Sequence, residues 1–526
     1  MNFERKSGVL LHISSLPDSF GIGTIGKNAY KFVDWLHESS QKLWQILPIG
    51  PTGYGDSPYA SFSTFAGNPL FVDLDNLVEK GWASKKDIVS PDYIKKDGNV
   101  DFSAVVWWKT PVLTKCALYF MKNASLEDKS DYNSFCDDNI NWINEYALFM
   151  SIKLFYDEKA KNEKVNSSVW NLYWPKELAS HNEDALTEWK KSHEESIEVV
   201  KIIQFFFDYQ WKRLKKYANE KGIQLIGDIP IFVASDSSDV WSNQKLFQLD
   251  ENGRPYCVSG VPPDYFSAEG QLWGNPLYDW NSMKKDNYSW WISRIKRIFE
   301  LTDCLRIDHF RGFEAYWSVL SSEKTAMNGK WVSGPGIDLF NTIKSSLGDL
   351  PIIAEDLGLI TESVRKLRED AGFPGMKVLQ FAFSPEEAKS NGMVNCFLPH
   401  QYENSDCVVY TGTHDNETLQ GWLSNTSDEQ LELIASYVEG KRISLAEAKK
   451  SVKNKKLGKK LIQIAFSSTA KYVIIPMQDV LCLGNESRMN IPSTANSNWS
   501  WRMGKNDLKK SNAEMLSFYS KMYGRS

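Results

Sequence analysis

Residues 303–312 read DCLRIDHFRG, and the interpretation of the whole chain starts from this stretch. Side chains alternate between two faces along a β-strand. Leu305 and Ile307 therefore share one face. Arg306 and Asp308 share the other face. A buried strand carries two such charged groups only where they face a polar cavity or form an ion pair at the strand end.

Two further stretches run from apolar residues into an acid. They are residues 350–358 (LPIIAEDLG) and 407–416 (CVVYTGTHDN), and helical sequence follows each of them. Three strand-like runs that end in carboxylates are typical of a parallel β/α barrel, in which the strand ends gather at one rim. That rim carries the active site in essentially every characterised barrel enzyme. The sequence therefore predicts an α/β fold, a (β/α)8 TIM barrel with large, mainly helical insertions between its strands.

Five further apolar runs supply the remaining barrel strands. They lie at residues 8–14, 42–49, 223–230, 373–383 and 471–478. Between the first two, residues 29–36 carry the spacing of an amphipathic helix. The block at about 73–221 is charged, helix-rich and ends in an amphipathic helix, so we predict an insertion there. We predict a second, substrate-loop insertion at about 230–300, so that residues 1–526 form a single catalytic barrel.

The composition argues against several classes of function. The chain has 61 basic and 66 acidic residues and a net charge of −5, which disfavours an electrostatic grip on nucleic acid or an anionic membrane. Aromatic residues make up 13% and include 20 tryptophans, whose flat rings suit sugar faces, although a large core would also use them. The seven cysteines are scattered without a C-x-x-C pair, which indicates a reducing compartment and neither a disulfide scaffold nor a zinc site. Without a signal-peptide core or an apolar run of roughly 18–20 residues, we expect a soluble, cytoplasmic protein.

Two other kinds of site are not favoured. Residues 21–26 (GIGTIG) satisfy G-x-G-x-x-G, but a dinucleotide fingerprint should follow its strand immediately and find an acid ending the second strand. Here residues 16–18 intervene, and the second strand ends in PIG at 48–50. Clustered acids could instead hold a metal, but three acids separated by 47 and 60 residues form no binding-loop pattern. We therefore predict neither a cofactor nor a metal.

The three acid-ending stretches resemble the characteristic regions of the α-amylase clan. In detail they are similar to those of the 4-alpha-glucanotransferases, also called amylomaltases or disproportionating enzymes, of glycoside hydrolase family 77. The likeness covers nearly the whole chain and is weakest at residues 75–200. It implies an enzyme that acts on maltooligosaccharides, cutting an α-1,4-glucan and passing the glycosyl unit, with retention, to the 4-hydroxyl of another glucan or of glucose through a glycosyl-aspartate. An α-1,4-glucan hydrolase using the same acids and a non-catalytic glucan-binding protein are the alternatives.

Retaining cleavage requires one carboxylate as nucleophile and a second acid as proton donor, about 5–5.5 Å apart. Arg306 favours the ionised carboxylate that a nucleophile requires, which assigns that role to Asp308. The apolar run before Glu355 implies desolvation, which raises a carboxyl pKa and suits the proton donor. The same reasoning fits the neighbouring Asp356, and only the resemblance selects Glu355. The resemblance also implies that Asp415 is the third acid, which holds hydroxyls of the sugar and supports an oxocarbenium-like transition state.

Two aromatic loops are the other candidate parts of the site. Residues 51–69 form a loop rich in Gly, Ser, Pro and Tyr, and residues 258–280 form a proline-stiffened loop whose exposed aromatics would be costly without a partner. We expect residues 261–266 (VPPDYF) to close over the acceptor side and exclude water. Two of the seven histidines flank two of the acids, although a lone histidine is more often structural. The resemblance implies that the substrate contacts are Tyr59, Asp228, Tyr265, Phe266, Gln271, Trp273, Arg306, His309 and His414.

The C-terminal part of the chain also resembles the family. Residues 488–494 read RMNIPST, and residues 498–502 read NWSWR. The family pattern has glycine where this chain has Ser493. We therefore expect the local loop geometry to be affected at that position, and the chemistry to be retained.

Overall fold

The computed structural model describes residues 4–263, 267–384, 395–494 and 497–526. Its centre is a parallel eight-stranded sheet in the order β10-β11-β12-β1-β2-β3-β6-β9. The N–H of Ala354 in β9 donates to the carbonyl of Pro374, just before β10, at 3.0 Å, so the sheet closes on itself. Each strand overlaps one of the eight predicted segments, and the predicted (β/α)8 barrel is confirmed. The strands are β1 (Lys6–Leu10), β2 (Leu43–Gln45), β3 (Gln224–Pro230), β6 (Cys304–Asp308), β9 (Ile352–Ala354), β10 (Gly375–Val378), β11 (Cys407–Tyr410) and β12 (Tyr472–Pro476).

The register of the barrel strands positions the acids. The strands are apolar because parallel strands in such folds are covered on both faces, and β9 and β11 are buried along their whole length. Between β3 and β6 the register pairs Asp228 with Arg306. Between β6 and β9 it pairs Ile307 with Ala354, the residue before Glu355. Acids from three neighbouring strands therefore reach the same rim of the barrel.

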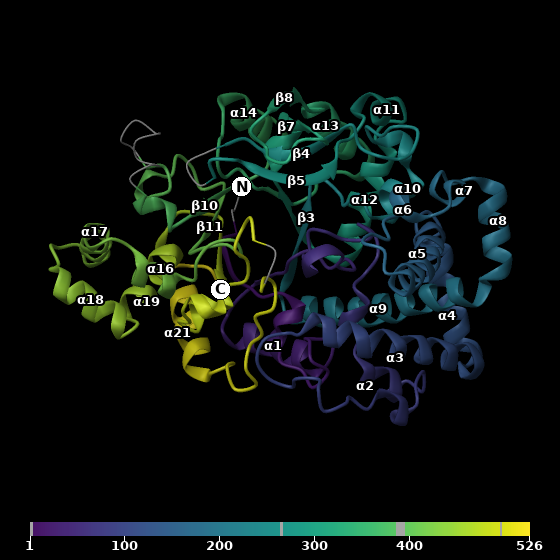
Figure 1. Ribbon diagram of the computed structural model, residues 1–526. Helices are drawn as coiled ribbons and strands as arrows, with labels where there is room; N and C mark the ends of the chain where they lie inside the picture. Colours follow the sequence, from purple (N-terminus) through teal and green to yellow (C-terminus); the bar gives the residue numbers. More distant parts are fainter. Residues whose placement is uncertain (1–3, 264–266, 385–394, 495–496) are drawn as a thin grey trace.

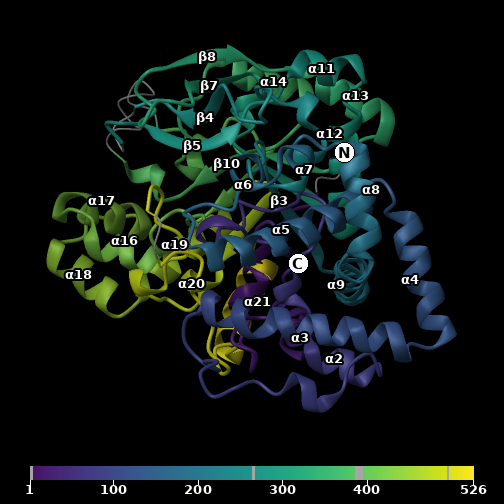
Figure 2. The same ribbon diagram turned by 45° about the vertical axis from the view of Figure 1, so that its right-hand side comes forward.

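The chain between β2 and β3 forms a block of helices beside the barrel, drawn in blue in Figures 1 and 2. The last of them, the predicted amphipathic helix, ties this block to the loop that carries Tyr59. Gln204 and Gln210 each exchange two hydrogen bonds of 2.8 and 2.9 Å with the backbone, at Gly67 and Asp73 respectively. The helices are α2 (Leu74–Glu79), α3 (Phe102–Asn123), α4 (Leu126–Asp138), α5 (Ile143–Glu163), α6 (Trp170–Tyr173), α7 (Lys176–Ala179), α8 (Glu183–Ser192) and α9 (Glu194–Glu220).

A four-stranded antiparallel sheet in the order β5-β4-β7-β8 lies above the barrel in Figure 1. Its strands are β4 (Cys257–Val261), β5 (Gln271–Pro276), β7 (Ala315–Leu320) and β8 (Gly329–Ser333). The prediction of a continuous loop over residues 258–280 is therefore wrong at residues 258–261 and 271–276, which are strands. The reason is that β4 also pairs with β7, a strand that comes after the catalytic stretch. Local sequence patterns do not reveal a pairing between strands so far apart along the chain.

The remaining helices cover the barrel and extend it on the side opposite the blue block. α16 to α19 lie between β11 and β12 and project to the left in Figures 1 and 2. The last helix, α21, packs on α1, and the Ser520 and Ser7 hydroxyls lie 2.9 Å apart. Among the described residues, no helix is both long and apolar enough to cross a membrane. These helices are α1 (Lys27–Glu38), α10 (Ser238–Ser242), α11 (Trp280–Lys285), α12 (Ser289–Leu301), α13 (Ile337–Leu347), α14 (Glu362–Ala371), α16 (Leu419–Asn425), α17 (Asp428–Glu439), α18 (Leu445–Lys453), α19 (Lys456–Ser467), α20 (Met477–Val480) and α21 (Lys510–Met522).

Candidate active site

One buried arginine holds two of the predicted site acids. Arg306 donates from Nη1 to both carboxylate oxygens of Asp228, at 2.9 and 2.7 Å, and from Nη2 to Asp308 Oδ1 at 2.7 Å. Asp228 also accepts the Tyr59 hydroxyl at 2.8 Å. The ion pair between Arg306 and Asp308, one of the two arrangements that the sequence allowed, is therefore present. It also lies at a polar rim, because the side chain of Asp308 keeps 29% of its surface exposed.

Glu355 lies beside this cluster, and two backbone N–H groups hold its carboxyl. Its Oε2 accepts the N–H of His309 at 2.8 Å, and its Oε1 accepts the N–H of Leu357 at 2.9 Å. Both oxygens of its carboxyl therefore contact the protein backbone, although the residue as a whole is only partly buried. Burial, assisted by the nearby charge of Asp308, raises the pKa of Glu355 to about 8. A carboxyl with such a pKa carries a proton at neutral pH, as a proton donor must.

Asp356 is occupied elsewhere. It accepts the N–H of Met376 at 2.7 Å and pairs with Arg368 at 3.2 Å. Burial raises the pKa of Asp356 as well, so its pKa does not distinguish it from Glu355. The contacts of Asp356 do distinguish it, because Met376 belongs to β10 and Arg368 belongs to α14. These contacts favour Glu355 over Asp356 as the proton donor, a choice that the residue pattern alone left open.

Asp415 and His414 approach from the loop after β11. Asp415 Oδ1 accepts the side-chain amide of Asn490 at 2.7 Å, and its Oδ2 lies 3.4 Å from His414 Nε2. The His414 ring stacks on Tyr59 with centroids 5.2 Å apart, which links this loop to the Asp228 cluster. Burial lowers the pKa of His414, so the neutral ring is favoured.

A second group of predicted contacts surrounds His309. This residue has a left-handed φ of 52°, unusual for a residue other than glycine. Its ring meets Trp273 edge-on at 4.7 Å, and Trp273 Nε1 donates to Gln271 Oε1 at 3.2 Å. The Nε2 of His309 is buried and has no hydrogen-bond partner among the described residues. Burial lowers the pKa of His309 to about 4, which leaves a neutral ring facing the site.

The predicted site residues thus form one connected set. The contacts run from His414 through Tyr59 and Asp228 to Arg306 and Asp308, and Glu355 joins this group to His309, Trp273 and Gln271. Tyr265 and Phe266, also predicted from the sequence, lie outside the described residues. The part of the chain that the structure describes contains no group of three or more His, Cys, Asp or Glu side chains that could hold a metal ion.

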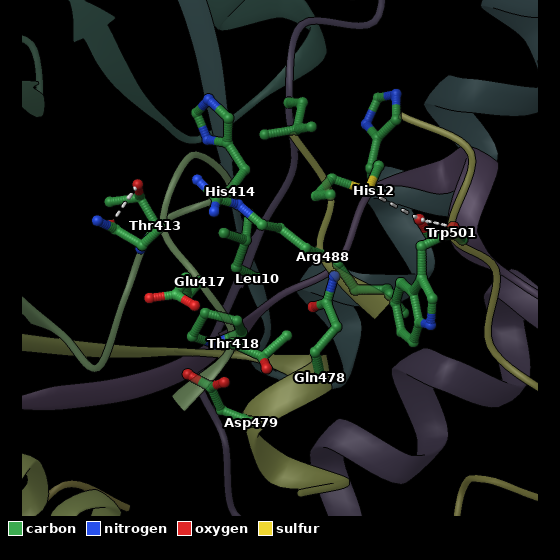
Figure 3. Close-up of a pocket in the computed structure, with 16 residues that line it drawn as sticks. Leu10, His12, Thr413, His414, Glu417, Thr418, Gln478, Asp479, Arg488 and Trp501 are labelled. Atoms are coloured by element: carbon green, nitrogen blue, oxygen red, sulfur yellow. Dashed lines mark hydrogen bonds between the residues drawn. The ribbon is translucent and has the colours of Figure 1, made fainter. Parts of the chain in front are cut away.

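Several residues near the site were not predicted from the sequence. A cavity of about 30 Å³ lies behind His414 and is lined by His12, Gln478, Asp479 and Arg488 (Figure 3). His12 and Arg488 were missed because neither adjoins a predicted acid in sequence. The resemblance of residues 488–494 to the family was the available signal for Arg488 and for Asn490.

Ser493 adopts the backbone conformation that explains the glycine expected there. Its φ of 65° lies in the left-handed region, which costs a residue with a Cβ roughly 1 kcal/mol. Ser493→Gly should therefore shift the midpoint of chemical unfolding upward, by an amount equivalent to at most about 1 kcal/mol. Ser500→Gly is the matched control, because Ser500 has no positive φ and glycine there should lower the midpoint. A lower midpoint for Ser493→Gly would contradict the inferred strain.

Comparison with known proteins adds to this geometry. The family model described as 4-alpha-glucanotransferase matches residues 11–507. A 4-alpha-glucanotransferase of Clostridium butyricum is 45% identical over 517 residues, which cover 98% of this chain and 100% of that protein. One of Streptococcus pneumoniae serotype 4 is 43% identical over 524 residues, covering 99% and 98%. The solved amylomaltase from Streptococcus agalactiae, in complex with acarbose, has a TM-score of 0.91 at 39% identity and is matched over 99% of this chain and 100% of its own.

Proposed function

The chain belongs to the 4-alpha-glucanotransferases of glycoside hydrolase family 77, and on this basis we propose that it transfers α-1,4-glucan segments to the 4-hydroxyl of an acceptor glucan or glucose through a covalent intermediate on Asp308. The acarbose complex of the solved relative supports a ligand of the oligosaccharide type. In this proposal the barrel and its insertions work as one catalytic unit over residues 1–526.

The first half of the reaction forms the glycosyl ester. Glu355 gives its proton to the glycosidic oxygen while an Asp308 carboxylate oxygen attacks the anomeric carbon. The bond between that carbon and the glycosidic oxygen breaks, and the leaving glucan departs with the proton. Arg306 holds the Asp308 carboxylate in place for the attack, since its Nη2 lies 2.7 Å from Asp308 Oδ1.

The second half transfers the glycosyl unit. Glu355, now ionised, takes the proton of the acceptor 4-hydroxyl, whose oxygen attacks the anomeric carbon. The ester bond breaks, Asp308 is released as a carboxylate, and Glu355 is protonated again. Two displacements on the same carbon retain its configuration. Asp415 supplies negative charge beside the oxocarbenium-like transition state and holds hydroxyls of the sugar.

A single observation carries this proposal: a carboxylate fixed by a buried arginine lies one strand away from a carboxyl with a raised pKa. Glu355 thus carries the proton that a retaining mechanism requires at neutral pH, and Arg306 holds the Asp308 carboxylate in place for the attack. The other predicted contacts, from Tyr59 to Trp273, are proposed to bind the sugars on either side of the scissile bond. Tyr265 and Phe266 remain predictions from the sequence.

Incubation with maltotriose, followed by chromatography of the products, tests the reaction class. Transfer should give glucose together with a ladder of longer maltodextrins, because each released unit is passed to another sugar. Net conversion to glucose and maltose without longer products would favour an α-glucan hydrolase. An unchanged substrate that nevertheless binds would favour a non-catalytic glucan-binding protein.

A further inference from the structure

Asp415 differs from Asp308 in how its carboxylate is held. Its side chain keeps 44% of its surface exposed, and it extends from a loop and not from a strand. Asp308, in contrast, is held by the guanidinium of Arg306. No lysine or arginine forms an ion pair with Asp415 anywhere in the described ranges. Some other group must therefore fix the orientation of this carboxylate.

Asn490 contacts both the side chain and the backbone of this loop. Its side-chain amide donates to Asp415 Oδ1 at 2.7 Å, across 75 residues of sequence. Its backbone N–H donates to the carbonyl of His414 at 3.1 Å. Asn490 alone therefore fixes both the position of the loop after β11 and the rotation of the Asp415 carboxylate.

Arg488 anchors this contact through main-chain carbonyls. Its Nε donates to the carbonyl of Asn490 at 2.7 Å, and its Nη2 donates to the carbonyl of Asp415 at 2.5 Å. Figure 3 shows Arg488 reaching past His414 at the wall of the small cavity. The guanidinium therefore joins the two loops, and neither bond is made to the Asp415 carboxylate.

Three residues in the described parts of this segment, residues 488–494 and 497–499, have backbone conformations with a local cost. Ser493, Ser497 and Trp499 have φ values of 65°, 64° and 63°, each in the left-handed region. Such residues cost on the order of 1 kcal/mol each and persist where surrounding contacts over-determine them. The Trp499 N–H donates to the Met489 carbonyl at 2.6 Å, next to the contact with Asp415. Backbone strain at several residues of a segment that contacts Asp415 indicates a functional constraint.

We propose that Asn490, anchored by Arg488, is a positioning residue that orients the Asp415 carboxylate toward the transition state. This inference rests on the proposed function, in which Asp415 faces a developing positive charge. A neutral amide suits that task because it fixes the carboxylate by a hydrogen bond and leaves its full negative charge available. A lysine or arginine at the same distance would orient the carboxylate and also neutralise it.

The test is a double-mutant cycle on transfer from maltotriose. Asn490→Ala should lower kcat by about 100-fold, the effect of a small misplacement of a reacting group, with KM changed much less. In an Asp415→Ala background, Asn490→Ala should cause no further loss, because there is no carboxylate left to orient. A loss of the same factor in both backgrounds would overturn the inference.

Two further variants separate the hydrogen bond from the integrity of the segment. Asn490→Asp keeps the shape but replaces the donor by a second carboxylate, so it should be at least as slow as Asn490→Ala. Asn498 holds the same segment, since its Oδ1 accepts the Ile491 N–H at 3.0 Å, and it has no hydrogen bond to Asp415. Asn498→Ala should therefore keep a kcat near that of the parent. Parental activity of Asn490→Asp, or an equal loss in Asn498→Ala, would contradict a role of the amide.

Failure of the proposed function would look different. If Asp415→Ala alone kept the parental kcat, the role of Asp415 and the inference built on it would both be wrong. If Asp415→Ala lost activity while Asn490→Ala did not, only the positioning role would be wrong. Should Asn490→Ala not fold, as judged by circular dichroism, the isosteric Asn490→Asp variant completes the same cycle.

Discussion

Asp308→Asn is expected to abolish transfer, with a loss in kcat of about 10⁴-fold or more. An amide cannot form the glycosyl ester, so both half-reactions stop. The fold should survive, because Arg306 keeps both of its bonds to Asp228 and the amide oxygen can still accept from Nη2. The measurement is transfer from maltotriose, together with a thermal unfolding curve of the purified variant.

Asp303→Asn is the matched control, since it makes the same chemical change at the opposite end of the same strand. Asp303 accepts the Leu225 N–H at 2.8 Å and lies 3.5 Å from the Lys215 ammonium, far from the acids at the rim. This variant should transfer at nearly the parental rate. Mass spectrometry after reaction with a fluorinated maltosyl donor should find the label on a peptide containing Asp308. A label on Glu355 or Asp415 would overturn the assignment.

Glu355→Gln should lose roughly 10²–10⁴-fold in rate with maltotriose, because the leaving glucan no longer receives a proton. With α-maltosyl fluoride, whose leaving group needs no proton, the loss should be much smaller. Asp356→Asn provides the comparison, because Asp356 holds Met376 and Arg368 and any loss should be the same for both donors. Equal losses for both donors in Glu355→Gln would instead indicate a positioning role for that residue.

The same assignment predicts a pH dependence. Burial raises the pKa of Glu355 to about 8, and the residue must be protonated when the leaving group departs. The rate with maltotriose should therefore fall as the pH rises through about 8, and it should be retained below that value until other groups titrate. With α-maltosyl fluoride this alkaline decline should be weaker. A flat profile from pH 7 to 9 with maltotriose would contradict the role of Glu355 as the proton donor.

The barrel was predictable because its strands are local features. A parallel strand covered on both faces must be an apolar run, and eight such runs could be read along the chain. The acids that end them mark the rim for the same reason, since a carboxylate is tolerated only where the apolar run stops. The physics of residues 303–312 therefore gave both a strand and a candidate nucleophile, while the role of Asp415 came from the family resemblance.

The contacts that distinguish two neighbouring acids appear only in the tertiary structure. Glu355 and Asp356 follow the same apolar strand, and burial raises both pKa values. Asp356 is held by Met376 and Arg368, from other elements, whereas Glu355 accepts the backbone N–H groups of His309 and Leu357. The strands at residues 257–261 and 271–276 were missed for a related reason, because the first pairs with β7, which lies beyond the catalytic stretch, and the second pairs with the first.

The sequence by itself therefore determined the barrel and the apolar runs that lead into Asp308 and Glu355, and its resemblance to the family predicted the chemistry. What it could not determine were contacts between loops that are distant along the chain. Asn490 meets Asp415 across 75 residues, because the loops after β11 and β12 converge at one rim when the barrel closes. A hydrogen bond of this kind depends on the packing of two backbones and leaves no periodicity or spacing in the sequence that could reveal it.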